Sequence, residues 1–484
     1  MGLHLPPTIA GIIGLPRQIA MVATVAFIFF LFWRDIREKP NVTRALWIPT
    51  LWMLLIASRP PTAWLRIAGI PIVGGSFEEG NPLDATVYLS LTLAGLYVLN
   101  QRRVSLSEFV RNNQWLTIFF VYCFLAIFWS DFPFPAFKRW IKILGHPVMV
   151  LVIFSEPDPM EALVRLLKRV AYVVLPVSIL WIKYYPELGR AADDWGGPMS
   201  NGGITVGKNA LGGACLVLGL VFVWHLLQVL RTEKCTSRRN ELRLITVLLL
   251  MVGWCLWKSH SATSWISLIV ALLVMVLLGL RTVNMRLIGA YALAAAVMLV
   301  IAQLTFDIYG KIVTVSGHES TIEGRGRLWT ALLAYHHNPV FGVGFESFWL
   351  GDRLDKFQEQ FRWKPTQAHN GYLETYLNLG IVGLLILIAF ILATFCKCRH
   401  ELLRNFDWGR LRMGLLIAIV VHNWTEAGFK GLAFAFLVFF IIAIDYPAFG
   451  IALSQASLEA TSPEEEPELV YSQEKLYVSG RTAI

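Results

Sequence analysis

The chain contains few charged residues for its length. Asp, Glu, Lys and Arg make up only 15% of its 484 residues, whereas 56% are hydrophobic. Soluble domains carry about a quarter charged residues, so this composition excludes an ordinary soluble protein. Apolar runs long enough to cross a bilayer recur along the chain, without the alternation of membrane-barrel strands. The expected fold class is therefore all-α, a polytopic transmembrane helical bundle of about 12–13 spans.

Cysteines are also scarce, and none of the six lies in the one long polar segment of the chain. A disulfide framework is therefore not expected. The pair Cys396 and Cys398 has no second pair at metal-ligand spacing, and neither has His336-His337. Gly342-Val343-Gly344 is not followed by a nucleotide-binding pattern and predicts a turn. We expect neither a metal nor another cofactor.

A cleavable signal peptide and an internal repeat are missing as well. The first strong apolar run, 19–33, is followed by a charged stretch without a small-residue cleavage site. Many secondary transporters are built from repeats that leave a symmetry in the sequence, and this chain shows none. A transporter is therefore less favoured than an enzyme.

The basic residues indicate how the chain crosses the membrane. The net charge of +9 is divided among short loops between apolar runs, which is typical of membrane topology rather than of a nucleic-acid groove. Loops rich in Lys and Arg alternate with less basic ones, and the positive-inside rule places the basic loops in the cytoplasm. The N-terminus, Lys208, Lys430 and the long polar segment are then expected to face outward. The candidate spans are 19–33, 45–57, 84–99, 114–129, 140–154, 170–182, 209–230, 244–257, 265–280, 287–305, 372–396, 413–427 and 431–449.

This pattern divides the chain into four parts. We expect N-terminal transmembrane helices over 1–305, a large outward-facing loop over 306–371 and C-terminal transmembrane helices over 372–450. The polar, acidic stretch 451–484 predicts a disordered cytoplasmic tail. The loop is the only long polar interruption, and long loops in compact chains tend to be functional.

Two stretches of the loop have apolar residues at helical spacing. The first begins near Leu328 and the second near Leu350. Both are expected to form amphipathic helices that lie on the bundle or at the membrane interface.

His369 is the first candidate for chemistry, because it directly precedes the apolar run that begins at Tyr372. The positive end of a helix dipole favours neutral imidazole, which is the form that a general base needs. Asn370, Glu374 and Asn378 continue as a polar stripe that should face the bundle interior. The alternative interpretation is a histidine that merely caps the helix.

Arg325 and Arg327 are candidates for binding an anion. Arginine offers a planar fork of donors that suits phosphate oxygens. Glycine on both sides of Arg325 lets the backbone approach a ligand, and a helix beginning near Leu328 would direct its N-terminus at the same place. A flexible turn with solvated arginines is the alternative.

Other ionisable residues lie at outward ends of the spans. Lys208 and Arg139 each open an apolar run, and interfacial snorkelling explains either of them alone. His422, Glu426 and Lys430 follow one another at a spacing of four residues, and charged groups at membrane depth are functional candidates. Glu426 and Lys430 are also able to pair with each other.

Three motifs of the loop occur in a fixed order. They are Gly324-Arg325-x-Arg327-Leu328-Trp329, then Asn338-Pro339 with Gly342-x-Gly344, then Ala368-His369-Asn370-x-Tyr372-Leu373-Glu374 with Gly380 and Gly383. This set resembles the O-antigen ligase and O-antigen/exopolysaccharide polymerase superfamily of bacterial inner-membrane glycosyltransferases. Weaker matches, such as Gly207-Lys208-Asn209, extend the resemblance and are more similar to the polymerases than to the lipopolysaccharide ligases.

The resemblance implies a glycan donor linked by diphosphate to a polyprenyl lipid on the periplasmic face. A hydroxyl of the acceptor attacks the anomeric carbon and the lipid diphosphate leaves with inversion, without a metal or a nucleotide. His369 would then remove the hydroxyl proton. Arg325 or Arg327 would hold the diphosphate together with Lys208 and Arg139, so the two arginines join His369 as expected catalytic residues. The expected substrate-binding residues are Lys208, Arg139, Asn370, Glu374 and Glu426.

The function expected from the resemblance is polymerisation of lipid-linked repeat units at the bacterial inner membrane. The alternatives are a ligase that transfers the glycan to a lipid A core or another acceptor, a lipid-linked glycan transporter, and an accessory or sensor subunit. Expected partners are the lipid-linked donor, a glycan or lipid-linked acceptor, and chain-length regulators or export proteins, but not nucleic acid.

Overall fold

The structure is a computed structural model that describes residues 16–38, 41–72, 74–75, 80–191, 199–294, 298, 319–361 and 363–446. This part of the chain is almost wholly helical, which confirms the prediction of an all-α bundle. The only strands within these ranges are β1, Arg190–Ala191, and β2, Ser200–Asn201, which pair antiparallel. The predicted tail 451–484 and residues 306–318 of the predicted loop lie outside the described residues.

Helices account for the predicted apolar runs. Twelve of the thirteen runs coincide wholly or in part with a helix, and the described part of 287–305 begins as an apolar helix over Met285–Ala294. The helices of the first half are α1 Arg17–Arg37, η2 Arg44–Leu46, α2 Trp47–Ala57, α3 Pro61–Ile67, α4 Pro82–Gln101, α5 Leu106–Asn112, α6 Gln114–Leu125, α7 Pro133–Phe154, α8 Pro159–Tyr184 and α9 Pro186–Gly189. Those of the second half are α10 Lys208–Arg231, α11 Thr236–Ser259, α12 Ala262–Leu278, η3 Met285–Leu287, α15 Glu319–Ala334, α16 Gly351–Gln360, α17 Gly371–Arg404, α18 Phe406–His422 and α19 Phe434–Ala443.

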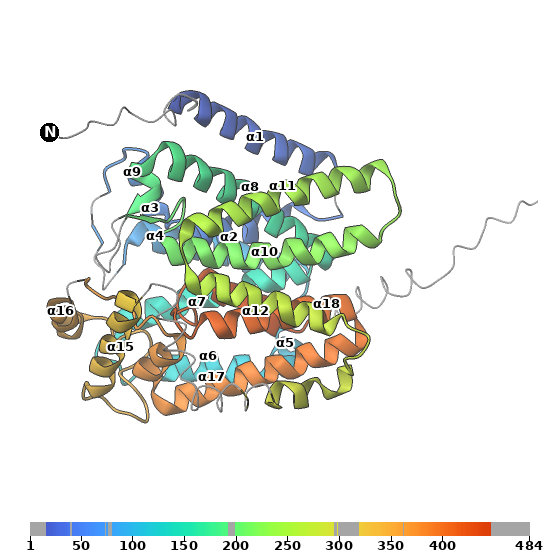
Figure 1. Ribbon diagram of the computed structural model, residues 1–484. Coiled ribbons are helices and arrows are strands. Elements are labelled where there is room, and N and C mark those ends of the chain that lie inside the picture. Colours follow the sequence, from blue (N-terminus) through green and yellow to red (C-terminus); the bar gives the residue numbers. More distant parts are fainter. Residues whose placement is uncertain are drawn as a thin grey trace, which may run out of the picture.

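The long helices lie side by side, and α15 and α16 gather at one end of the bundle (Figure 1). Among the described residues, five helices are long and apolar enough to cross a membrane: α1, α4, α10, α11 and α17. Large apolar side chains such as Phe29, Phe128 and Leu250 remain exposed on the outside of the bundle. A lipid environment accounts for this surface, and the chain is a multi-pass membrane protein.

Buried ion pairs join α1 to α8. The carboxylate of Asp35 accepts from Arg165 at 2.9 Å and from Arg169 at 2.8 Å, and all three residues are buried. Both arginines belong to α8 rather than to a loop between helices. The helix extends over them because Asp35 supplies the opposite charge that a buried guanidinium requires.

The polar segment folds onto the bundle around a small core of its own. Leu328 and Leu332 of α15 and Leu354 and Phe357 of α16 are buried in this core, which confirms both amphipathic helices. However, α15 begins at Glu319 rather than near Leu328, so the helix N-terminus predicted beside the two arginines is wrong. Two glycines weaken a helix by about 1 kcal/mol each, and packing of the apolar face outweighs this cost.

A break in α17 holds the turn 338–344 against the bundle. Gly380 has a left-handed φ of 66°, and the backbone around it pairs with the turn, as in the 2.9 Å bond from Ile381 N to Pro339 O. Gly344 N donates to Asn378 O at 2.9 Å from the other side of the break. The turn predicted for 342–344 is confirmed, and its backbone bonds fix the loop to α17.

Candidate active site

His369 lies at the entry to α17, outside the helix itself. Asn370 is the N-cap, and its side-chain oxygen accepts from Tyr372 N and Leu373 N at 3.0 Å each. Gly371 N donates to Asn423 O at 2.8 Å, and a Cβ at Gly371 would lie 2.2 Å from Asn423 Oδ1. This close approach ties the entry of α17 to the end of α18. The imidazole of His369 is therefore presented from a fixed backbone rather than from a loose loop.

Glu426 connects three distant parts of the chain. Its Oε1 accepts from Arg325 Nη2 at 2.7 Å and from Asn209 Nδ2 at 2.6 Å, while its Oε2 lies 3.5 Å from His369 Nδ1. Arg325 comes from α15, Asn209 from the first turn of α10 and His369 from the entry of α17. The carboxylate is buried, so these three partners replace the water that it would otherwise bind.

The charges around Glu426 decide its ionisation. Burial raises the pKa of this carboxyl, but the contact with His369 and the positive charge of Arg325 lower it by more, and the pKa is held below its usual range. Glu426 is thus a permanent anion at neutral pH. It can orient an imidazole through Nδ1 and stabilise the cation that forms when the imidazole takes up a proton.

A cavity of about 640 Å³ opens beside this cluster. Lys208, His369, His422 and Glu426 all line it, so the structure brings together residues that are far apart in the sequence. Figure 1 places the elements that carry them, the N-terminal ends of α10 and α17 and the end of α18, at the same side of the bundle. Arg325 does not line the cavity itself, but it donates to Glu426, which does.

Besides Arg325, four of the predicted site residues do not line the cavity. Asn370 caps α17, and Arg327 is exposed on α15. A guanidinium nitrogen of Arg139 donates to the carbonyl of Glu346. Glu374 is buried and accepts from Ala368 N at 2.8 Å, so it holds the segment before His369 in place. Their roles as substrate ligands remain predictions.

The ion pairs of the predicted His422, Glu426 and Lys430 series differ from the sequence interpretation. Lys430 Nζ bonds Glu374 Oε1 at 2.8 Å, so the suggested pair between Glu426 and Lys430 is wrong. Glu426 pairs instead with Arg325. The segment that carries Arg325 and the segment that carries Glu374 both fold over the end of α18. The spacing of residues along a single helix cannot predict such contacts between separate elements.

Some residues of the cavity wall were missed from the sequence. Asn209, Arg59 and Lys142 line the cavity, but they were given no role. The sequence feature that could have identified Asn209 is its position next to Lys208, at the outward start of an apolar run. Arg59 donates to the carbonyls of Leu188 at 2.8 Å and Ile204 at 3.2 Å. In the part of the chain that the structure describes, no group of three or more His, Cys, Asp or Glu is placed to hold a metal ion.

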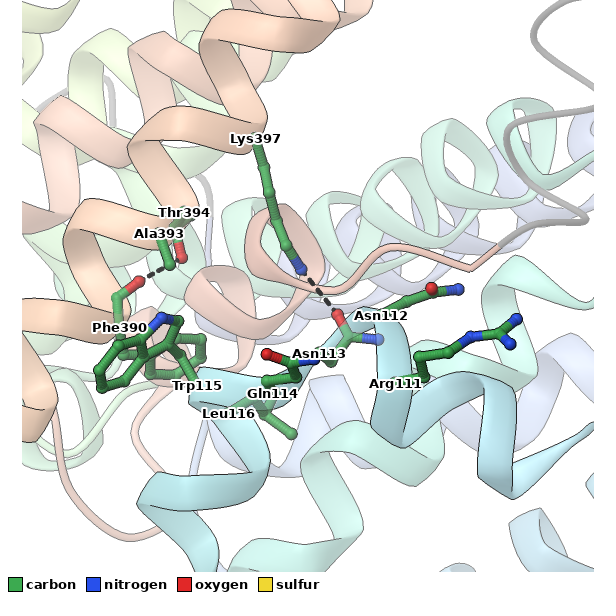
Figure 2. Close-up of a pocket in the computed structure, with 10 residues that line it drawn as sticks. All are labelled: Arg111, Asn112, Asn113, Gln114, Trp115, Leu116, Phe390, Ala393, Thr394 and Lys397. Atoms are coloured by element: carbon green, nitrogen blue, oxygen red, sulfur yellow. Dashed lines mark hydrogen bonds between the residues drawn. The ribbon is translucent and has the colours of Figure 1, made fainter.

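A second pocket lies far from this cluster. Figure 2 shows it between the junction of α5 with α6 and the C-terminal part of α17, where Lys397 Nζ donates to Asn113 Oδ1 at 2.8 Å. Lys397 follows the start of α17 by 26 residues, which corresponds to about 39 Å along a helix. The pocket measures about 260 Å³, and no residue predicted for the site lines it.

Two comparisons with known proteins concern the family that the chain resembles. Residues 244–388, which include Arg325 and His369, match a family described as O-Antigen ligase. The exopolysaccharide production protein ExoQ of Rhizobium meliloti (strain 1021) is 27% identical over 298 residues, 58% of this chain. The chain covers 64% of that relative, slightly less than two thirds of its length. These similarities confirm that the loop motifs resemble those of the O-antigen ligase and polymerase superfamily.

Proposed function

We propose that the protein is a glycosyltransferase that polymerises oligosaccharide repeat units carried on polyprenyl diphosphate. The observation that carries this proposal is the cluster of His369, Glu426 and Arg325 beside a cavity lined by Lys208. The cluster contains a base, His369, and a carboxylate that orients this base, Glu426. Arg325 and Lys208 add cations that can stabilise an anionic leaving group. These are the components of a metal-independent transfer of a glycosyl group from a diphosphate.

His369 acts as the general base in this proposal. Its Nδ1 faces Glu426 at 3.5 Å, which leaves Nε2 for the hydroxyl of the acceptor. As the hydroxyl oxygen bonds to the anomeric carbon, its proton passes to Nε2, and the anionic Glu426 stabilises the imidazolium. Arg325 and Asn209 hold the carboxylate from its other oxygen, so the base keeps one orientation.

The leaving group departs toward the cations of the cavity. The bond between the anomeric carbon and the diphosphate oxygen breaks, and the electron pair remains on the lipid diphosphate. Attack and departure on opposite faces of the sugar invert the anomeric centre. The negative charge that develops on the leaving oxygen is stabilised most when fixed cations already face it, and Lys208 lies at the cavity wall in this role.

Two further points complete the proposal. The alternation of basic loops supports a cavity on the periplasmic side of the bacterial inner membrane. The name of the relative, which concerns exopolysaccharide production, favours a polymerase. The family description favours the second candidate, a ligase that passes the glycan to a lipid A core.

The test uses purified protein, a donor of polyprenyl-diphosphate-linked oligosaccharide and gel analysis of the products. His369→Ala should lower the transfer rate by roughly a hundred- to ten-thousand-fold, because a positioned general base contributes that much. His336→Ala is the matched control, since His336 lies in the same loop and is exposed. Transfer by His369→Ala at the wild-type rate would contradict the assignment of the base. A ladder of repeat units identifies a polymerase, and a single transfer to a lipid A core identifies a ligase.

A further inference from the structure

Lys142 is a cation inside the bundle to which neither the motifs nor the ion-pair network gives a role. It lies nine residues after the first residue of α7, which is roughly 13 Å into the helix. It lines the same cavity as Lys208 and His369. Charged side chains at membrane depth are costly and are functional candidates for that reason.

Within the described residues, Lys142 has no hydrogen-bond or ion-pair partner. The carboxylates that act on it at longer range are Asp84 and Glu346, and both are engaged elsewhere. Asp84 accepts from Thr62 N and Thr62 Oγ1 at 2.8 Å each, and Glu346 accepts from Gly431 N. A half-buried ammonium without a counterion is unfavourable unless a ligand supplies the negative charge.

The neighbouring cations are committed to the protein itself. Arg59 donates to backbone carbonyls, Arg139 donates to the carbonyl of Glu346, and Arg325 pairs with Glu426. Lys138 and Arg139 add positive charge near Lys142 rather than neutralising it. This part of the cavity therefore carries positive charge without an equal number of nearby anions among the described residues.

The N-terminus of α10 faces the same cavity. Residues 207–210 line it, and Gly207 provides no side-chain cap for the helix. A Cβ placed on Gly207 would meet nothing within 4 Å, so there is open space beside the first turn. The first backbone N–H groups of a helix have no partner within the helix, and together with the helix dipole they attract anions.

We propose that Lys142 and the first turn of α10 bind the diphosphate of the lipid-linked donor between them. This inference rests on the proposed glycosyl transfer and assigns its leaving-group site. Lys208 supports the same site from the α10 side. Lys142 thereby takes the role that the sequence suggested for Arg139, whose guanidinium is bonded to the loop instead.

Binding of a simple probe tests this site without requiring turnover. Full-length protein in nanodiscs is titrated with farnesyl diphosphate, and with farnesyl monophosphate as the second probe. Lys142→Met should weaken diphosphate binding by about tenfold or more, and Lys142→Arg should retain most of it. The monophosphate should bind more weakly and respond less to Lys142→Met, because it has fewer oxygens to share between the two walls.

Lys138→Met is the matched control. Lys138 lies one turn earlier on α7, with its ammonium over the ring of Phe134 at 4.7 Å, and it does not line the cavity. The Lys138→Met variant should bind farnesyl diphosphate with the same affinity as the wild type. Equal affinity of Lys142→Met and the wild type would overturn the inference while leaving the proposed function in place. Failure of the wild type to bind farnesyl diphosphate at all would overturn both.

A second measurement guards against misfolding of the variant. Because Lys142 has no ion-pair partner in the part of the chain that the structure describes, Lys142→Met should unfold at the same temperature as the ligand-free wild type or at a higher one. Addition of farnesyl diphosphate should then raise the unfolding temperature of the wild type more than that of the variant. A ligand-free Lys142→Met protein that unfolds at a lower temperature would show that the cation has a structural partner, and would contradict the inference.

Discussion

Arg325 and Arg327 are two positions apart on α15, so their side chains point in different directions. Arg325 is buried against Glu426, and Arg327 is exposed. Lysine lacks the planar fork and cannot replace a guanidinium that is bonded in a fixed direction. We expect Arg325→Lys to lower the transfer rate by roughly ten- to a thousand-fold and Arg327→Lys to change it less than about twofold. Rates of both variants with the same donor measure this, and the reverse order would contradict the structure.

Glu426 is the second residue whose substitution has a clear expected effect on the transfer rate. Glu426→Gln keeps the shape but removes the charge that faces Arg325 and His369, which leaves a buried cation without its counterion. We expect a loss of about a hundredfold in rate, together with a lower unfolding temperature. The control is Glu187→Gln, since the pair of Glu187 with Arg17 is exposed and contributes little.

The same substitution also changes the dependence of stability on pH. The pKa of Glu426 is lower in the folded protein than its ordinary value of 4.5. Its contribution to stability is therefore complete above pH 4.5 and is lost as the pH falls through the folded pKa. The difference in unfolding temperature between the wild type and Glu426→Gln should accordingly shrink below pH 4.5. A difference that grows in acid would contradict the sign of the shift.

At the scale of elements, the break in α17 is what positions the loop. A Cβ at Gly380 would lie 2.1 Å from Val340 O, and the residue has a positive φ of 66°. We expect Gly380→Ala to destabilise the protein by roughly 2–4 kcal/mol and to lower transfer, because the turn and the helix cannot both keep their places.

Thermal unfolding of Gly380→Ala measures this, and Gly253→Ala is its control. Gly253 lies within α11, and a Cβ there would meet nothing within 4 Å. Alanine favours a helix over glycine by about 1 kcal/mol, so Gly253→Ala should leave stability unchanged or raise it. Equal effects of the two substitutions would mean that the break does not hold the turn.

At the scale of the whole molecule, the prediction concerns which side of the membrane each loop faces. Cys235 is exposed between α10 and α11, in a loop that the basic residues place in the cytoplasm. As the only cysteine of a variant, it should react with an impermeant thiol reagent only after the membrane is broken. Arg327→Cys as the only cysteine should react in intact spheroplasts. The opposite pattern would reverse the orientation and move the proposed reaction away from the periplasm.

The sequence by itself determined the helices and their places along the chain. In a membrane, each apolar run must satisfy its backbone groups within its own segment, so the pattern that predicts a helix is local. For this reason the runs at 209–230 and 372–396 are found almost unchanged in α10 and α17. The loop motifs were equally local, and they identified His369 and Arg325 as candidate site residues.

Only the tertiary structure decided which polar groups meet. Arg325 and Asn209 are 101 and 217 residues from Glu426 in the sequence, and no periodicity relates them. The start of α15 and the partner of Lys430 were missed for the same reason, since packing of separate elements outweighs local preference. Nothing in the sequence singled out Lys142 among the cations of its run. Its position on the cavity wall without a described partner depends on the fold, which brings residues of α4, α7 and α10 to one cavity.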